Sequence, residues 1–165
     1  MAAVARRFHG HLRSERPDGS TSRVAAPYIH VAVGLDLDVE PTLFLIDTGA
    51  DNTSLSPSDA FGVLGEEYLE IDFETHDRRI AISGVGRGSA VAVIEWMQLT
   101  LFDTSGFYLT ISTPITIFEP MPRYPGRHGN WQMPSLLGRD ILQHFRLLVE
   151  YDPPIVELSR VEKAT

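Results

Sequence analysis

The chain has 165 residues and no cysteine, which excludes disulfide bonds and metal sites built on thiolate ligands. Its formal net charge of −8 argues against a nucleic-acid partner, because contact with phosphates requires a basic surface. No apolar run approaches the roughly 18 residues of a membrane-spanning helix, so we expect a soluble protein without membrane contact. The lack of cysteine favours a reducing compartment, so a cytoplasmic location is expected. No metal site is expected, because His9 and His11 have no further ligand nearby in the sequence.

The N-terminal segment, residues 1–26, differs in charge from the rest of the chain. It carries five arginines and two acids, a net charge of +3 that leaves −11 for the remainder. Because residues 17–20 add proline, glycine and serine, the segment is predicted to be a flexible basic tail. A folded domain is expected over residues 27–160, with a C-terminal end at 161–165. Organelle targeting by the tail stays open, although its acids count against a transit peptide.

Alternation of apolar and polar residues predicts that the domain consists mainly of strands. It begins at Tyr28, where Ile29, Val31 and Val33 point to one face of a half-buried strand. Many short strands separated by turns are typical of an all-β barrel or sandwich. Further strands are predicted at 42–46, 69–73, 79–82, 90–96, 98–102, 107–112, 115–118, 147–149 and 155–158.

Helical signals are few. Serine followed by proline at Ser56-Pro57 favours a brief helical turn, and apolar residues at helical spacing make 140–145 the one convincing helix. A proline-rich connection over residues 119–135 separates this helix from the preceding strands. Connections of this length are more often functional or mobile than inert.

The most informative stretch is a buried strand that ends in an acid. Four apolar residues, 43–46, run directly into Asp47-Thr48-Gly49. An isolated ionised carboxylate at the edge of a core is costly, so Asp47 is either paired or placed there for its charge. Alone, the tripeptide is weak evidence because it occurs often by chance.

Two later stretches strengthen this motif. Residues 82–88 read Ile-Ser-Gly-Val-Gly-Arg-Gly, and residues 136–142 read Leu-Leu-Gly-Arg-Asp-Ile-Leu. In this order, and together with residues 44–51, they resemble the retropepsin family, the retroviral-type aspartic proteases. The resemblance covers about residues 28–158. It implies a small closed acid-protease barrel, single-lobed and dimerising, with a flap hairpin and one short C-terminal helix. It also implies an aspartic endopeptidase that acts on peptide or protein substrates without a cofactor.

An aspartic protease needs two carboxylates, one to take a proton from water and one to give a proton to the peptide carbonyl. This chain offers one Asp-Thr-Gly. At 103–106 a serine interrupts a similar motif between two alternating segments, which indicates a hairpin turn. Residues 63–65 resemble the second motif in part but lack the Arg-Asp pair that follows it. We therefore expect a homodimer with Asp47 and its symmetry mate at the two-fold axis.

The resemblance also assigns residue roles. Asp47, Thr48 and Gly49 would form the catalytic motif, with Thr48 bonding across the dimer. Asp51 and Arg139 would form an ion pair that holds the catalytic loop to the helix. The residues expected to contact substrate are Ala50, Asp51, Ser83, Gly84, Val85, Gly86, Trp131 and Met133. Those expected to support the catalytic loop are Leu136, Leu137, Gly138, Arg139 and Asp140.

Three alternatives stay open at this stage. Trp131 and Met133 either form pocket walls or anchor the long loop over 119–135. The chain could instead be a retropepsin-like module that binds peptides, or serves in assembly, without cutting them. Asp47 could also be a structural cap or a buried partner of Arg139 in a monomeric barrel.

Overall fold

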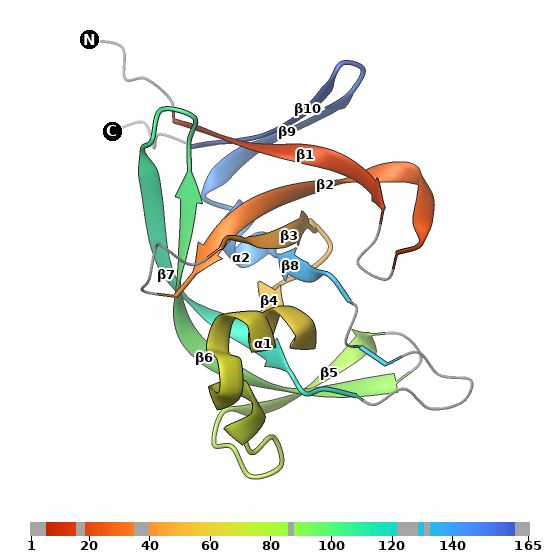
Figure 1. Cartoon of the computed structure of the whole chain (residues 1–165), viewed down its shortest axis with the longest axis vertical. Coiled ribbons are helices and arrows are strands. Elements are labelled where there is room, and N and C mark those ends of the chain that lie inside the picture. Colours follow the sequence, from red (N-terminus) through yellow and green to blue (C-terminus); the bar gives the residue numbers. More distant parts are fainter. Residues whose placement is uncertain are drawn as a thin grey trace.

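The computed structural model describes residues 6–15, 19–34, 40–85, 88–121, 129–130 and 133–160, and most of these residues lie in strands (Figure 1). The all-β character predicted from the sequence is confirmed. The described strands are β1 (Arg7–Glu15), β2 (Thr21–Val33), β3 (Thr42–Ile46), β4 (Ser54–Leu55), β5 (Arg79–Val85), β6 (Gly88–Phe102), β7 (Tyr108–Phe118), β8 (Ser135–Leu137), β9 (Phe145–Tyr151) and β10 (Pro154–Arg160). The described helices are α1 (Pro57–Leu64), the 3-10 helix η1 (Gly65–Glu70) and α2 (Arg139–Leu142).

The strands form one curved sheet with the hydrogen-bonded order β5-β6-β7-β4-β8-β3-β2-β1-β10-β9, and β2 also pairs with β6. Most neighbours are antiparallel, but β3 pairs with β8 in parallel and β4 pairs with β7 in parallel. Parallel pairing joins segments that are distant in the sequence. The pairing of Ile46 with Leu137 places the two predicted motifs side by side.

The hairpin of β6 and β7 confirms one predicted turn. The strands predicted at 90–96 and 98–102 merge into β6, and those at 107–112 and 115–118 merge into β7. Between them, Oδ1 of Asp103 accepts hydrogen bonds from the backbone N–H of Ser105 at 2.8 Å and of Phe107 at 2.9 Å. The Ser105 hydroxyl also donates a hydrogen bond to Asp103 Oδ1. This bond, and to a smaller extent the two backbone bonds, lower the pKa of Asp103. Gly106 completes the turn with a φ of 83°, which glycine adopts without strain.

The prediction of a flexible tail over residues 1–26 is wrong for the described part of that segment. Arg7–Glu15 is a strand that pairs with β10 on one side and β2 on the other. Phe8 is completely buried in the main core. A Cβ atom on Gly10 would lie 2.1 Å from the carbonyl oxygen of Tyr28, so the close approach of β1 to β2 requires glycine there. The alternation of buried and exposed residues in β1 is short, and the arginines around it make the segment resemble a solvated tail.

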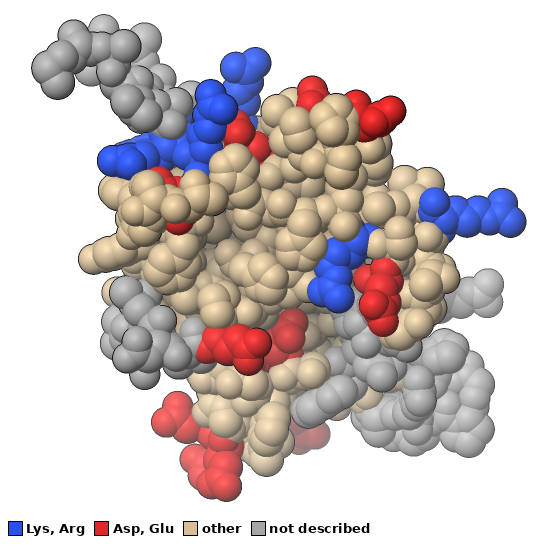
Figure 2. Space-filling view, turned by 45° about the horizontal axis from the view of Figure 1, so that its top comes forward, with Lys and Arg blue, Asp and Glu red and all other residues tan. Residues whose placement is uncertain are grey.

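Two of those arginines are neutralised by acids from distant elements. Arg6 lies 3.6 Å from the Asp103 carboxylate and 4.3 Å above the ring centre of Phe107. Arg7 lies 3.6 Å from Glu157 on β10. The positive charge that suggested a tail therefore belongs to the sheet surface, and Figure 2 shows basic side chains gathered at the upper left of that view.

The structure contains more helices than the single short C-terminal helix that was expected. The turn predicted at Ser56-Pro57 extends into α1, where the hydroxyl of Ser56 accepts a hydrogen bond from Asp59 N at 3.2 Å. This is a standard N-terminal cap with proline in the first turn. The predicted C-terminal helix, 140–145, is shorter in the structure, because α2 ends at Leu142 and β9 begins at Phe145.

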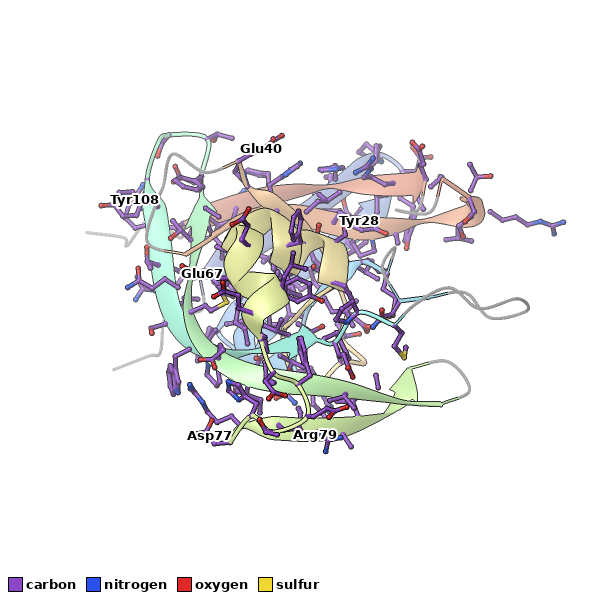
Figure 3. The ribbon with its side chains drawn as sticks, turned by 60° about the horizontal axis from the view of Figure 1, so that its bottom comes forward. Tyr28, Glu40, Glu67, Asp77, Arg79 and Tyr108 are labelled. Carbon is purple, nitrogen blue, oxygen red and sulfur yellow. The ribbon has the colours of Figure 1, made fainter. Side chains whose placement is uncertain are left out.

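The strand predicted over 69–73 is also wrong, since η1 and turns occupy that region. Leu69, which the alternation assigned to a buried face, is 64% exposed, while Tyr68 is 1% exposed and donates its hydroxyl to the carbonyl of Phe118 at 2.8 Å. Burial, and then the charge of Glu119, raise the pKa of Tyr68, so this hydroxyl remains a donor. Figure 3 labels Arg79 at the start of β5, close to this turn region.

The main core lies between the curved sheet and the helices. It includes Phe8, Phe44, Leu55, Leu137 and Ile141, which come from five different elements and are at most 1% exposed. A second, smaller cluster of Ala90, Ala92 and Phe118 lies on the β5–β6 hairpin and the neighbouring end of β7. Among the described residues, no helix is both long enough and apolar enough to span a membrane.

Candidate active site

Strand β3 fixes the position of Asp47. Phe44 and Ile46 of this strand are buried, and β3 is paired with β2 on one edge and β8 on the other. Immediately beyond β3, the backbone N–H of Asp47 donates to the carbonyl of Leu137 at 3.1 Å. Asp47 therefore begins its loop from a strand that is held on both sides.

The Asp47 loop, residues 47–53, presents a carboxylate at the surface. The backbone N–H of Gly49 donates to Oδ1 of Asp47 at 2.8 Å, and the N–H of Ala50 donates to the Asp47 carbonyl at 3.2 Å. Thr48 and Gly49 are exposed, and Asp47 itself is partly buried. The bond from Gly49 orients the carboxylate while leaving it accessible to a reactant.

Helix α2 holds the Asp47 loop from behind. The N–H of Arg139 donates to the carbonyl of Ala50 at 2.9 Å, and the N–H of Asp140 donates to the carbonyl of Asp51 at 3.2 Å. The guanidinium of Arg139 also bonds the Asp51 carboxylate, so the predicted pair forms and Asp47 is not the partner of Arg139. Both side chains of the pair are exposed, which limits its contribution to roughly 1 kcal/mol or less.

Asp140 and Thr53 add a second connection, which is less exposed. Thr53 is completely buried; its N–H donates to Oδ2 of Asp140 at 2.9 Å and its hydroxyl to Oδ1 at 2.7 Å. The same hydroxyl accepts a hydrogen bond from Gly138 N at 3.0 Å. Asp140 was predicted as a support of the loop, whereas Thr53 was missed. No periodic pattern in the sequence indicates that the threonine six residues after Asp47 bonds Asp140.

Gly138 allows β8 and the Asp47 loop to approach closely. A Cβ atom at this position would lie 2.5 Å from the carbonyl carbon of Asn52 and 2.8 Å from the backbone nitrogen of Thr53. Both are backbone atoms that cannot move aside without disturbing the loop. The supporting residues predicted around position 138 thus pass directly behind the candidate catalytic loop.

A further polar network, also missed from the sequence, connects α1 to β8. The hydroxyls of Ser56 and Ser135 both donate to Oδ2 of Asp59, at 3.0 and 2.5 Å. Ser135 in turn accepts a hydrogen bond from the N–H of Ser56 at 3.0 Å. Both serines are at most 1% exposed, and Ser135 begins the strand that pairs with β3. Asp59 therefore fixes the position of β8 relative to α1.

We expect Asp59→Ala to destabilise the fold by about 2 kcal/mol, because two buried hydroxyl donors would lose their shared acceptor. Asp59→Asn keeps an acceptor oxygen and should cost clearly less. Urea unfolding of both variants measures the difference. Equal losses for the two variants would show that the acceptor oxygen is not what matters at this position.

The residues predicted to lie in a flap fall on the β5–β6 hairpin. Ser83, Gly84 and Val85 belong to the end of β5, where Ser83 pairs with Ser89 and Val85 with Gly88 around a register shift. Gly86 lies outside the described residues. A hairpin is thus present where the resemblance predicts one, on the strands that form the edge of the sheet opposite β9.

The segment before β8 contacts this hairpin and the end of β7. Met133 packs against the cluster of Ala90, Ala92 and Phe118. This contact agrees with Met133 as an anchor of the loop and does not separate that role from a pocket wall. Trp131 lies outside the described residues.

Asn130 was not singled out from the sequence, yet it fixes the two ends of the proline-rich connection. Its side chain accepts a hydrogen bond from Met121 N and donates one to the carbonyl of Glu119, both at 2.7 Å. Asn130 is 2% exposed, and its own carbonyl accepts a hydrogen bond from Met133 N at 3.1 Å. One buried amide therefore connects the end of β7 to the segment that leads into β8.

These contacts bring together most of the predicted loop and support residues, namely Asp47, Thr48, Gly49, Ala50, Asp51, Leu136, Leu137, Gly138, Arg139 and Asp140. Within the described part of the chain, no three His, Asp or Glu side chains are grouped so that they could hold a metal ion. No model of a known protein family matches the sequence, and no curated protein matches it. Chemically, the loop offers an oriented, accessible carboxylate on a rigid support.

Proposed function

We propose that this protein is a retropepsin-like aspartic endopeptidase that works as a homodimer. The observation that carries the proposal is the attachment of the Asp47 loop to α2: Arg139 and Asp140 bond the carbonyls of Ala50 and Asp51. Two short motifs, each weak alone, thereby form one unit around an accessible carboxylate. The pairing of β2 with β6 supports the closed barrel that the family resemblance implies.

In the proposed mechanism, the two Asp47 carboxylates of the dimer share one proton. Like charges this close do not both ionise, so one carboxylate takes a proton from water while the other donates its proton to the peptide carbonyl oxygen. The bond from Gly49 to Asp47 keeps each carboxylate oriented for this exchange. Gly49 also leaves room for a substrate backbone, and the β5–β6 hairpin would close over it.

A second subunit is required because one chain supplies one suitable carboxylate. The nearest alternative, Asp103, is bonded within its own hairpin turn and to Arg6. The exposed Thr48 and Gly49 leave the Asp47 loop open to contact from a second copy. We therefore propose that the second carboxylate of the site is Asp47 of the partner subunit.

The test is the dependence of cleavage on protein concentration, measured by mass spectrometry on a diverse peptide mixture between about pH 4 and about pH 7. If the site needs two chains, the rate should rise with the square of concentration when monomers dominate and linearly once dimers do. Cleavage strictly proportional to concentration in a range where sedimentation shows only monomer would contradict the proposal. Capture of peptides without cleavage at any concentration would instead identify a binding module.

A further inference from the structure

Two histidine side chains lie together on the surface of the sheet, at the place where β1 and β2 separate. His11 belongs to β1 and His30 to β2, both are exposed, and their ring centres are 5.4 Å apart. The pairing of the two strands, which lie side by side in Figure 1, starts with His11 opposite Tyr28. His30 therefore lies just beyond the paired residues, where β1 has already turned to β10.

Both rings of this histidine pair are available to a ligand. Neither imidazole forms a hydrogen bond or an ion pair with another described residue. His76 is different, because its two nitrogens contact Arg78 N and Glu95. Burial, and then the nearby His30 and Arg13, lower the pKa of His11. A lowered pKa keeps the ring neutral, and the neutral imidazole carries the lone pair that binds a metal ion.

The separation of the two rings suits the binding of one metal ion between them. A histidine nitrogen lies about 2.0–2.1 Å from a bound Zn²⁺, which places the ring centre about 3.2 Å from the ion. Two rings bound at a tetrahedral angle then have centres about 5.2 Å apart, close to the observed 5.4 Å. The ring planes are inclined by 31°, so the two rings do not form a parallel stack.

The surroundings favour a transition metal ion over Mg²⁺ or Ca²⁺. Those two ions need oxygen ligands, and no carboxylate of a described residue forms an ion pair with either ring. The positive charge of Arg13 beside His11 also opposes an ion that is held by charge alone. Imidazole nitrogens suit Zn²⁺ and Cu²⁺. Two protein ligands are fewer than the three or four of most zinc sites, so water would complete the coordination and binding would be reversible.

We propose that His11 and His30 together bind a divalent transition metal ion, such as Zn²⁺, as a reversible bridge between β1 and β2. In the sequence, His11 is accompanied by His9 alone, and no further ligand is nearby. Folding brings His30 beside His11 from the neighbouring strand. The bridge joins the two strands at the point where β1 leaves β2 to pair with β10. It does not depend on the proposed endopeptidase activity.

The test is calorimetric titration of the full chain, without a histidine tag, with ZnCl₂. The parent should bind one ion per chain. His11→Ala and His30→Ala should each raise the dissociation constant for Zn²⁺ at least about tenfold, because the remaining ring loses the advantage of a second, intramolecular contact. His9→Ala and His144→Ala are the matched controls. They remove exposed histidines outside the pair and should leave the dissociation constant unchanged.

Thermal unfolding of the same samples gives a second measurement. A ligand that binds only the folded chain raises Tm, so Zn²⁺ about a hundredfold above its dissociation constant should raise the Tm of the parent by about 5 °C or more. MgCl₂ should not raise it. Without metal, both pair variants should unfold near the Tm of the parent, because His11 and His30 are exposed.

Loss of Zn²⁺ binding in both pair variants, with binding kept in both controls, supports the bridge. Three results would overturn it: a parent chain that does not bind Zn²⁺, binding that survives either substitution in the pair, or binding that falls equally in His9→Ala. Peptide cleavage is not part of this measurement, so its failure leaves the proposed endopeptidase standing.

Discussion

Asp47→Asn is expected to lower the rate of peptide cleavage at least about a thousandfold, because an amide can neither accept a proton from water nor pass one on. The fold should survive, since the Asn side-chain oxygen can still accept the hydrogen bond that Gly49 N donates to Asp47 Oδ1 at 2.8 Å. Cleavage of the peptide mixture and thermal unfolding, measured on the same preparation, check both parts of this expectation. A variant that cleaves as fast as the parent would remove Asp47 from the mechanism.

Mixing the Asp47→Asn variant with the parent chain sharpens the test. Random assortment of equal amounts leaves about one quarter of the dimers with two carboxylates, so activity per parent chain should fall by about half. A monomeric enzyme would show no such loss when the variant is added. The control is the same mixture made with Glu67→Arg, which does not alter the loop and should leave the activity of each parent chain unchanged.

The second large effect concerns stability. Gly138→Ala should destabilise the fold by about 2–3 kcal/mol, because the added Cβ would lie within 2.8 Å of three backbone atoms of Asn52 and Thr53. Relief of that contact requires the Asp47 loop to move away from β8, so cleavage should fall as well. Urea unfolding gives the change in free energy.

Gly62→Ala is the matched control. Gly62 lies in α1, where an added Cβ meets no atom within 4 Å. Because alanine has the better helix propensity, this variant should be more stable than the parent by about 0.5–1 kcal/mol. If the two alanine variants shifted stability in the same direction, the close packing of β8 on the Asp47 loop would not be the cause of the loss at Gly138.

Sequence patterns predicted those parts of the fold whose burial is periodic or whose turns have distinctive chemistry. The strand at 42–46, the turn at 103–106 and the cap at Ser56 were all predictable in this way. Alternation failed at 69–73, because Tyr68 and Phe73 are buried from a 3-10 helix and a turn. At 7–15 the alternation does not indicate a strand, because a strand with one buried aromatic residue and several arginines resembles a solvated segment.

For the candidate site, local motifs could be read but their long-range partners mostly could not. Asp51 and Arg139 are 88 residues apart, and only the family resemblance connected them beforehand. The bonds of Asp59 to Ser135 across 76 residues have no sequence signal at all. Polar contacts of this kind depend on which strands become neighbours, and the parallel pairing of β3 with β8 is a property of the whole sheet.

The position of β1 has a consequence for the order of events during synthesis. β1 is the only described strand that connects the β9–β10 hairpin to the rest of the sheet, since β10 pairs with β1 and β9 alone. During synthesis β1 emerges before β10, so one edge of β1 stays without its partner strand until residues 154–160 have been made. We infer that the ten described strands form their complete sheet only after β10 has been synthesised, and that removal of β1 would separate the β9–β10 hairpin from the other described strands.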